Sequence, residues 1–187
     1  MKKYFIIAFV ALILPMICFS FYPQNKNYLA NMVSLNQMRT TYPELKDVKI
    51  RLVPISSDLV VCEDEENAET CSPRYSTYHI DTQTIFIWKD MSPFVFKYWV
   101  IHEYGHMIDF TTMNKKQVEA WTELFYNNPN HVSRYSLVSP AESFAEWFAV
   151  YKYGMRDEQT YDGVESIFDS PQAKFMDQVY PKYRKPI

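Results

Sequence analysis

The chain has 187 residues, of which 48% are hydrophobic and 17% aromatic, and only three are Gly. This composition excludes a disordered or low-complexity protein and indicates one domain with a sizeable core. The formal charge of -3 and the lack of a basic stripe in the sequence argue against nucleic-acid binding.

Residues 1–20 predict a secretory signal peptide, because two lysines precede an apolar run over 4–19 and the small Ser20 follows it. The run also approaches the length that spans a bilayer, so an uncleaved anchor is the alternative. Residues 21–187 then form one domain outside the cell, either secreted without membrane contact or membrane-anchored. Two of the 19 basic residues lie in the leader, which leaves 17 against 22 acidic residues and a charge of -5.

The first half of this domain predicts a helix followed by short strands. Apolar residues spaced three apart predict a helix over 26–41, which Pro43 ends. KIRLVPI and DLVVC favour strands, and STYHIDTQTIFIW favours a hairpin whose second strand covers 84–88. Cys62 and Cys71 favour a disulfide in an oxidising compartment, with metal binding by the two thiols as the alternative. The acidic loop between them is interpreted as a solvated loop, with a calcium site as its alternative.

The second half predicts helices. A helix beginning at Pro93 is apolar on nearly every side as far as Ile101, so it is expected to be central and buried. Further helices are expected over 115–126, from Ser139 to a stop at Gly154, and over 170–179. Strands followed by helices, without an internal repeat or linker, indicate an α+β fold.

The pentapeptide HEYGH at 102–106 carries the clearest chemical signal. His102 and His106 lie one helical turn apart on the same face, where two imidazoles can hold one zinc ion. Glu103 is angled to reach a water on that metal and to pass its proton to a leaving amine. The spacing therefore suits metal-assisted hydrolysis. The alternative is a pair of helix histidines that only bond to neighbouring side chains.

A third ligand is expected from Glu rather than from His79 or His131, because neither histidine follows the pentapeptide at a short spacing. Glu142 and Glu146 stand four apart on an otherwise apolar helix, and two buried carboxylates repel each other unless positive charge is near. We expect Glu142 to bind the metal and Glu146 to accept the N–H of a ligand histidine. An exposed acidic pair is the alternative.

HEYGHMID and YSLVSPAESFAEWFA together resemble the catalytic domain of anthrax lethal factor and the related secreted Pro-Pro endopeptidases. These are zinc metallopeptidases of the HExxH class whose third ligand is a Glu on a later helix. The resemblance covers the stretches near 99–110 and 135–149 and includes the spacing, with Tyr135 seven residues before Glu142 and Glu146 four after it.

The resemblance implies a zincin-like domain with a small mixed sheet followed by helices. It also implies one Zn²⁺ per chain, bound by His102, His106 and Glu142. Glu103 would be the general base, and Tyr135 would donate to the oxyanion, with a packed loop tyrosine as the alternative for that residue.

The resemblance further implies how a peptide would bind. In zincin folds an edge strand above the active helix pairs with extended substrate, and TIFIW is the candidate for that strand. Trp88 at its end is a candidate wall of the substrate pocket, or else a core residue. Cleavage between prolines is implied only by the resemblance. Asp109, three residues after His106, also fits the family pattern, without an assigned role.

The sequence therefore predicts a secreted, monomeric zinc metalloendopeptidase that acts on extracellular proteins or peptides, including proline-rich ones. One alternative is a non-catalytic, zinc-containing binding module. Glu103 and Tyr135 argue against it, because a structural zinc site needs neither. The other alternative is a toxin-type protease aimed at host proteins, which shares the chemistry and differs in its target.

Overall fold

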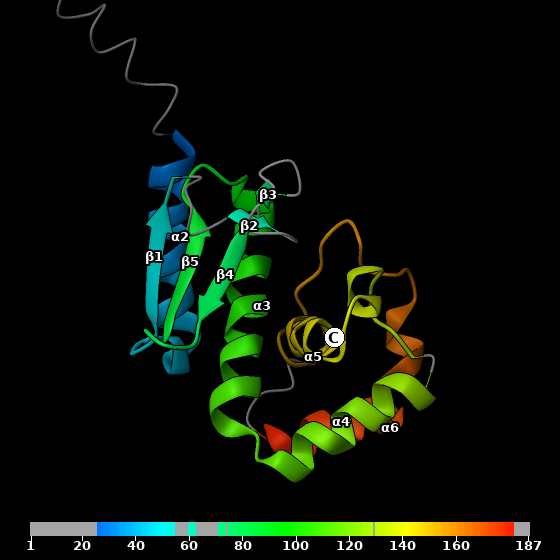
Figure 1. The fold of residues 1–187 in the computed structure, drawn as a ribbon. Coiled ribbons are helices and arrows are strands. Elements are labelled where there is room, and N and C mark those ends of the chain that lie inside the picture. Colours follow the sequence, from blue (N-terminus) through cyan, green and yellow to red (C-terminus); the bar gives the residue numbers. More distant parts are fainter. Residues whose placement is uncertain (1–25, 55–59, 63–70, 74, 129, 182–187) are drawn as a thin grey trace, which may run out of the picture.

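The computed structural model describes residues 26–54, 60–62, 71–73, 75–128 and 130–181, which form a mixed α+β fold (Figure 1). The predicted signal peptide and the acidic loop between the two cysteines lie outside these residues. Within the described part of the chain, no helix is both long and apolar enough to cross a membrane.

A three-stranded mixed sheet contains β1 (Lys49–Val53), β4 (Ser76–His79) and β5 (Thr84–Trp88), in the order β1-β5-β4. The predicted hairpin is confirmed, since β4 and β5 pair antiparallel. The expectation that TIFIW is an edge strand is wrong. β1 pairs parallel with the other side of β5, so β5 is central and β4 is the edge. Pairing on both sides suits β5, whose Ile85 and Ile87 are fully buried.

Two shorter strands, β2 (Val60–Cys62) and β3 (Cys71–Pro73), form a separate antiparallel pair. Their register places Cys62 opposite Cys71. The side chains of both residues lie outside the described part of the structure, so the disulfide between them stays a prediction.

Two helices build the core behind the sheet. α2 (Lys26–Thr41) is confirmed as predicted and is followed by the 3-10 turn η1 (Pro43–Leu45). α3 (Pro93–Thr112) packs against α2, β4 and β5. Alternate residues of β5 point into one apolar core with residues of both helices, including Ile85, Ile87, Leu35, Met38, Phe96 and Val100.

α3 divides the molecule, with the sheet and α2 on one side and the later helices on the other (Figure 1). The later helices are α4 (Lys115–Asn127), α5 (Pro140–Trp147) and α6 (Pro171–Val179), with the 3-10 turns η4 (Tyr135–Leu137) and η6 (Val164–Ile167). The helix expected from Ser139 to Gly154 is confirmed, since α5 continues directly into a π-helical segment, η5 (Phe148–Lys152), and Gly154 with its φ of 61° ends it. Ten of the twenty residues of α3 are buried, all between Phe96 and Asp109, which agrees with a central helix, whereas Phe94 in the first turn is 83% exposed.

Candidate metal centre

Gly105 of the pentapeptide allows α3 and α5 to approach closely. A Cβ atom added at Gly105 would lie 2.9 Å from the Cα atom of Ala145 and 3.2 Å from the Cβ atom of Phe148. Backbone and Cβ atoms cannot move aside without shifting a helix. The short distance between the helices brings side chains of α5 against the two histidines of α3.

Gly105→Ala is therefore expected to displace α5 and the carboxylate of Glu142. Overpacking of this kind costs about 1–3 kcal/mol of unfolding free energy. We expect a lower melting temperature and weaker metal binding, measured by thermal unfolding and, with zinc as the probe, by competition with a chromophoric chelator. Wild-type values for both quantities would contradict the role given to Gly105.

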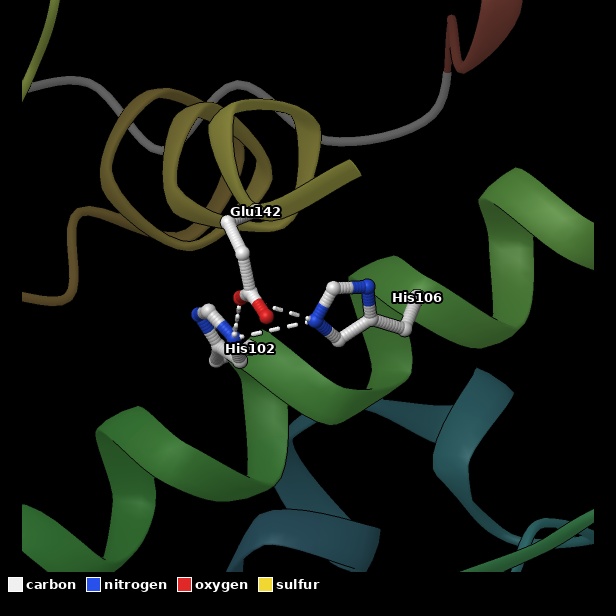
Figure 2. A group of neighbouring side chains, drawn as sticks. All are labelled: His102, His106 and Glu142. Atoms are coloured by element: carbon white, nitrogen blue, oxygen red, sulfur yellow. Dashed lines mark hydrogen bonds and ion pairs between the residues drawn. The ribbon is translucent and has the colours of Figure 1, made fainter. Parts of the chain in front are cut away.

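Three donor atoms from α3 and α5 converge on one point (Figure 2). The Nε2 atoms of His102 and His106 and the Oε2 atom of Glu142 each lie 3.1 Å from the other two. Ligands at about 2.0–2.1 Å from zinc in a tetrahedral site are roughly 3.3 Å apart, so the triangle has the size that this metal needs. The three residues could hold a metal ion.

Glu146 contacts the ring nitrogen of His102 that does not belong to this triangle. It is fully buried, and its Oε1 atom lies 2.7 Å from the Nδ1 atom of His102. The hydroxyls of Tyr98 and Ser133 donate to the two oxygens of the same carboxylate. When Nε2 of His102 binds a metal, Nδ1 carries the proton and donates it to Glu146, which sets the orientation of the ring.

The charges of the cluster favour a cation between the carboxylates. Burial by itself lowers the pKa of His102, but hydrogen bonds to Glu142 and Glu146 outweigh it and raise the pKa to about 10. Burial alone raises the pKa of Glu142, but its hydrogen bonds to His102 and His106 hold that pKa below its usual range. The site therefore stabilises positive charge, which either protons or a metal ion can supply.

Local interactions at the start of α5 determine where Glu142 lies. Ser139 caps the helix as predicted, because its hydroxyl oxygen accepts the backbone N–H of Glu142 at 3.1 Å. The indole N–H of Trp121 in α4 donates to the carbonyl oxygen of Pro140 at 2.7 Å. The first contact fixes the first turn of α5 and the second joins that turn to α4, so together they determine where Glu142 lies.

Glu103 does not belong to the donor triangle, which is formed by the ligating atoms of His102, His106 and Glu142, and it makes a hydrogen bond of its own. Its side chain is only 4% exposed, and the hydroxyl of Ser76 on the edge strand β4 donates to its Oε1 atom at 2.6 Å. The contact joins the edge strand to the carboxylate that follows the first histidine, and nothing in the sequence pattern indicated it.

The donor triangle and Glu103 line a cavity of about 380 Å³. Three residues of the edge strand also line it, namely Ser76, Thr77 and Tyr78, together with Trp99 and Tyr135. The ring centroid of Tyr135 is 5.8 Å from that of His102, so the predicted tyrosine lies at the site. The other residues that line this cavity are Tyr75, Phe110, Ala141 and Gln159.

Trp88 does not line this cavity. It lines a neighbouring one and stacks on Tyr75, with ring centroids 6.0 Å apart and planes inclined by 13°. Tyr75 and Trp99 line both cavities, so these two aromatic residues lie between Trp88 and the cavity of the metal-ligating group.

The structure brings five predicted residues into one cavity, namely His102, Glu103, His106, Tyr135 and Glu142. Prediction from sequence missed three hydroxyl donors around them. Tyr98 precedes His102 by four residues and so shares its helix face, a signal that could have found it. Ser76 and Ser133 come from a strand and a loop, and their spacing gives no such signal.

Comparison of the chain with protein-family models, with curated proteins and with solved structures finds no significant match in any of the three. Its function is therefore inferred from the geometry and chemistry of its own side chains.

Proposed function

We propose that the chain is a secreted zinc metalloendopeptidase that hydrolyses peptide bonds of extracellular proteins. One observation carries this proposal: three donor atoms at mutual distances of 3.1 Å line the same cavity as a buried carboxylate outside their triangle. A purely structural zinc site uses four protein ligands, whereas a catalytic one uses three and keeps a position for water. The zincin-like arrangement is part of the proposal.

His102, His106 and Glu142 would hold the metal ion. Bound zinc supplies a Lewis acid that acidifies water and polarises a carbonyl. Glu103, positioned by Ser76, takes a proton from the attacking water at its carboxylate and delivers it to the leaving amine nitrogen. Tyr135 donates its hydroxyl proton as a hydrogen bond to the oxyanion that develops on the carbonyl.

The substrate would bind in extended form along β4. Among the described strands, β4 pairs only with β5, and its residues Ser76, Thr77 and Tyr78 line the cavity. A peptide that adds to this edge would place its backbone above α3 and its carbonyl groups near the donor triangle. The assignment of β4 replaces the earlier expectation for TIFIW and uses the same binding mode.

Removal of the metal tests the proposal. The purified chain is expected to contain about one zinc ion per molecule by atomic emission and to cut a peptide library that includes proline-rich members. A chelator should abolish cleavage, and added zinc should restore it. Zinc binding without cleavage of any peptide would instead favour a non-catalytic module, and absence of zinc binding would remove the basis of both.

A further inference from the structure

A second cavity, of about 370 Å³, adjoins the one at the metal centre. It lies where α3 ends, α4 begins and α5 starts, and its walls are mainly apolar, with Met113, Val118, Trp121 and Pro140 among them. Phe110 and Ala141 line both cavities, so the two adjoin. The second cavity therefore lies beside the place where a peptide would bind at the metal centre.

Asp109 is the single charged residue among those that line this cavity. It is only 8% exposed, and within the described residues no hydrogen bond or ion pair engages its carboxylate. Burial raises the pKa of Asp109 to about 6, against an opposite effect of nearby His106. A carboxylate in mainly apolar surroundings is costly, and a cation that enters the cavity would stabilise it in addition to the effect of His106.

We propose that this cavity is a subsite for a long cationic side chain, that of Lys or Arg, with Asp109 as its counter-charge. The inference rests on the proposed peptidase function for the identity of the ligand as part of a peptide. Lys and Arg match the cavity because their methylene stems suit apolar walls while their charged ends need a carboxylate.

The position of Asp109 also determines which residue of the peptide would enter. Asp109 follows His106 by three residues, which is about 4.5 Å along a helix axis. An extended peptide advances by about 3.3 Å per residue. For a peptide that runs along β4 beside α3, as proposed above, the cationic side chain therefore belongs to a residue directly beside the cleaved bond or one further away.

Binding of small probes tests the subsite without relying on activity. We expect n-butylguanidinium to bind the chain about tenfold or more tightly than uncharged n-butylurea, the difference that a charge-assisted hydrogen bond supplies. Asp109→Asn should abolish this difference, while Glu123→Gln, at an exposed position of α4, should keep it. Titrations followed by NMR, with and without zinc, measure both affinities. Equal affinities of the two probes for the wild-type chain would overturn the proposal.

Stability separates a ligand-binding carboxylate from a structural one. Since burial disfavours the ionised form of Asp109, Asp109→Asn is expected to raise the melting temperature at pH 8 by several degrees. A marked fall would mean that Asp109 supports the fold through a contact that the substitution breaks, and would overturn the subsite.

Cleavage connects the subsite to specificity. Two peptides that differ only in Arg against norleucine beside the cut should differ in kcat/KM, and Asp109→Asn should reduce their ratio by about tenfold. An equal loss on both peptides together with weaker zinc binding would mean that Asp109 acts through His106, contrary to the proposal. If the probes discriminate but no peptide is cut, the cation site stands and the proposed peptidase function fails.

Discussion

Glu103→Gln is expected to reduce kcat by about 10²–10⁴-fold while leaving the fold and zinc content unchanged, because Gln keeps the shape of the side chain and loses the proton acceptor. The amide still accepts the hydroxyl proton of Ser76, so the edge strand stays attached to α3. The loss should appear in kcat rather than in KM, since Glu103 does not belong to the donor triangle. Steady-state kinetics on one cleaved peptide, with zinc measured on the same sample, provide the check.

A second variant tests the hydrogen bond that Ser76 donates to the carboxylate of Glu103. Ser76→Ala removes the hydroxyl that donates to Glu103 and should give a smaller loss of kcat, with Ser76→Thr closer to wild type because it keeps a hydroxyl. Turnover at the wild-type rate in Glu103→Gln would show that another group takes the proton of the water, and the proposed mechanism would be wrong.

Glu142→Ala is expected to weaken zinc binding by more than about 100-fold. Loss of a residue that only hydrogen-bonds a metal ligand already costs about 10–100-fold in metal affinity, and Glu142 is itself a proposed ligand. The substitution removes one corner of a triangle whose sides are all 3.1 Å, and leaves two imidazoles that bind zinc with fewer bonds. Activity should fall in parallel at low zinc concentration. Zinc affinity is measured by competition with a chelator at fixed pH.

Glu123→Ala is the matched control, because it removes a carboxylate from an exposed position of α4 outside the cavity. It should bind zinc as the wild-type chain does. If Glu142→Ala also binds zinc with wild-type affinity, the third ligand must be another group, and the assignment of this carboxylate would have to be abandoned.

Sequence periodicity was enough to predict the elements that carry the site. The positions of α2, α3, α4 and α6, and the β4–β5 hairpin, follow from apolar spacing and from Pro and Gly at their ends, which are local properties of each segment. The same helical period places His102 and His106 on one face of α3 and Glu142 and Glu146 on one face of α5.

Only the tertiary structure showed what those faces contact. Glu142 lies against Nε2 of His102 and Glu146 against Nδ1 of the same ring, so two carboxylates one turn apart have different roles. The close approach that allows this depends on Gly105 meeting Ala145, and on a cap and an indole contact that hold the start of α5.

The expectation for TIFIW was wrong for a related reason. A strand of alternating or continuous apolar residues reads the same at the edge or in the centre of a sheet, because its own pattern does not reveal how many neighbours it has. β1 joins β5 from more than 30 residues away in the chain, and this pairing makes β4 the edge strand and puts Ser76 beside Glu103.

The sequence alone thus determined the helices, the hairpin and the residue types able to ligate a metal, since these depend on neighbours within a few residues along the chain. The tertiary structure decided which carboxylate meets which nitrogen, which strand lies over α3, and that Asp109 faces a second cavity. Those features depend on the packing of distant segments against one another, a non-local property that the spacing of residues in one segment does not encode.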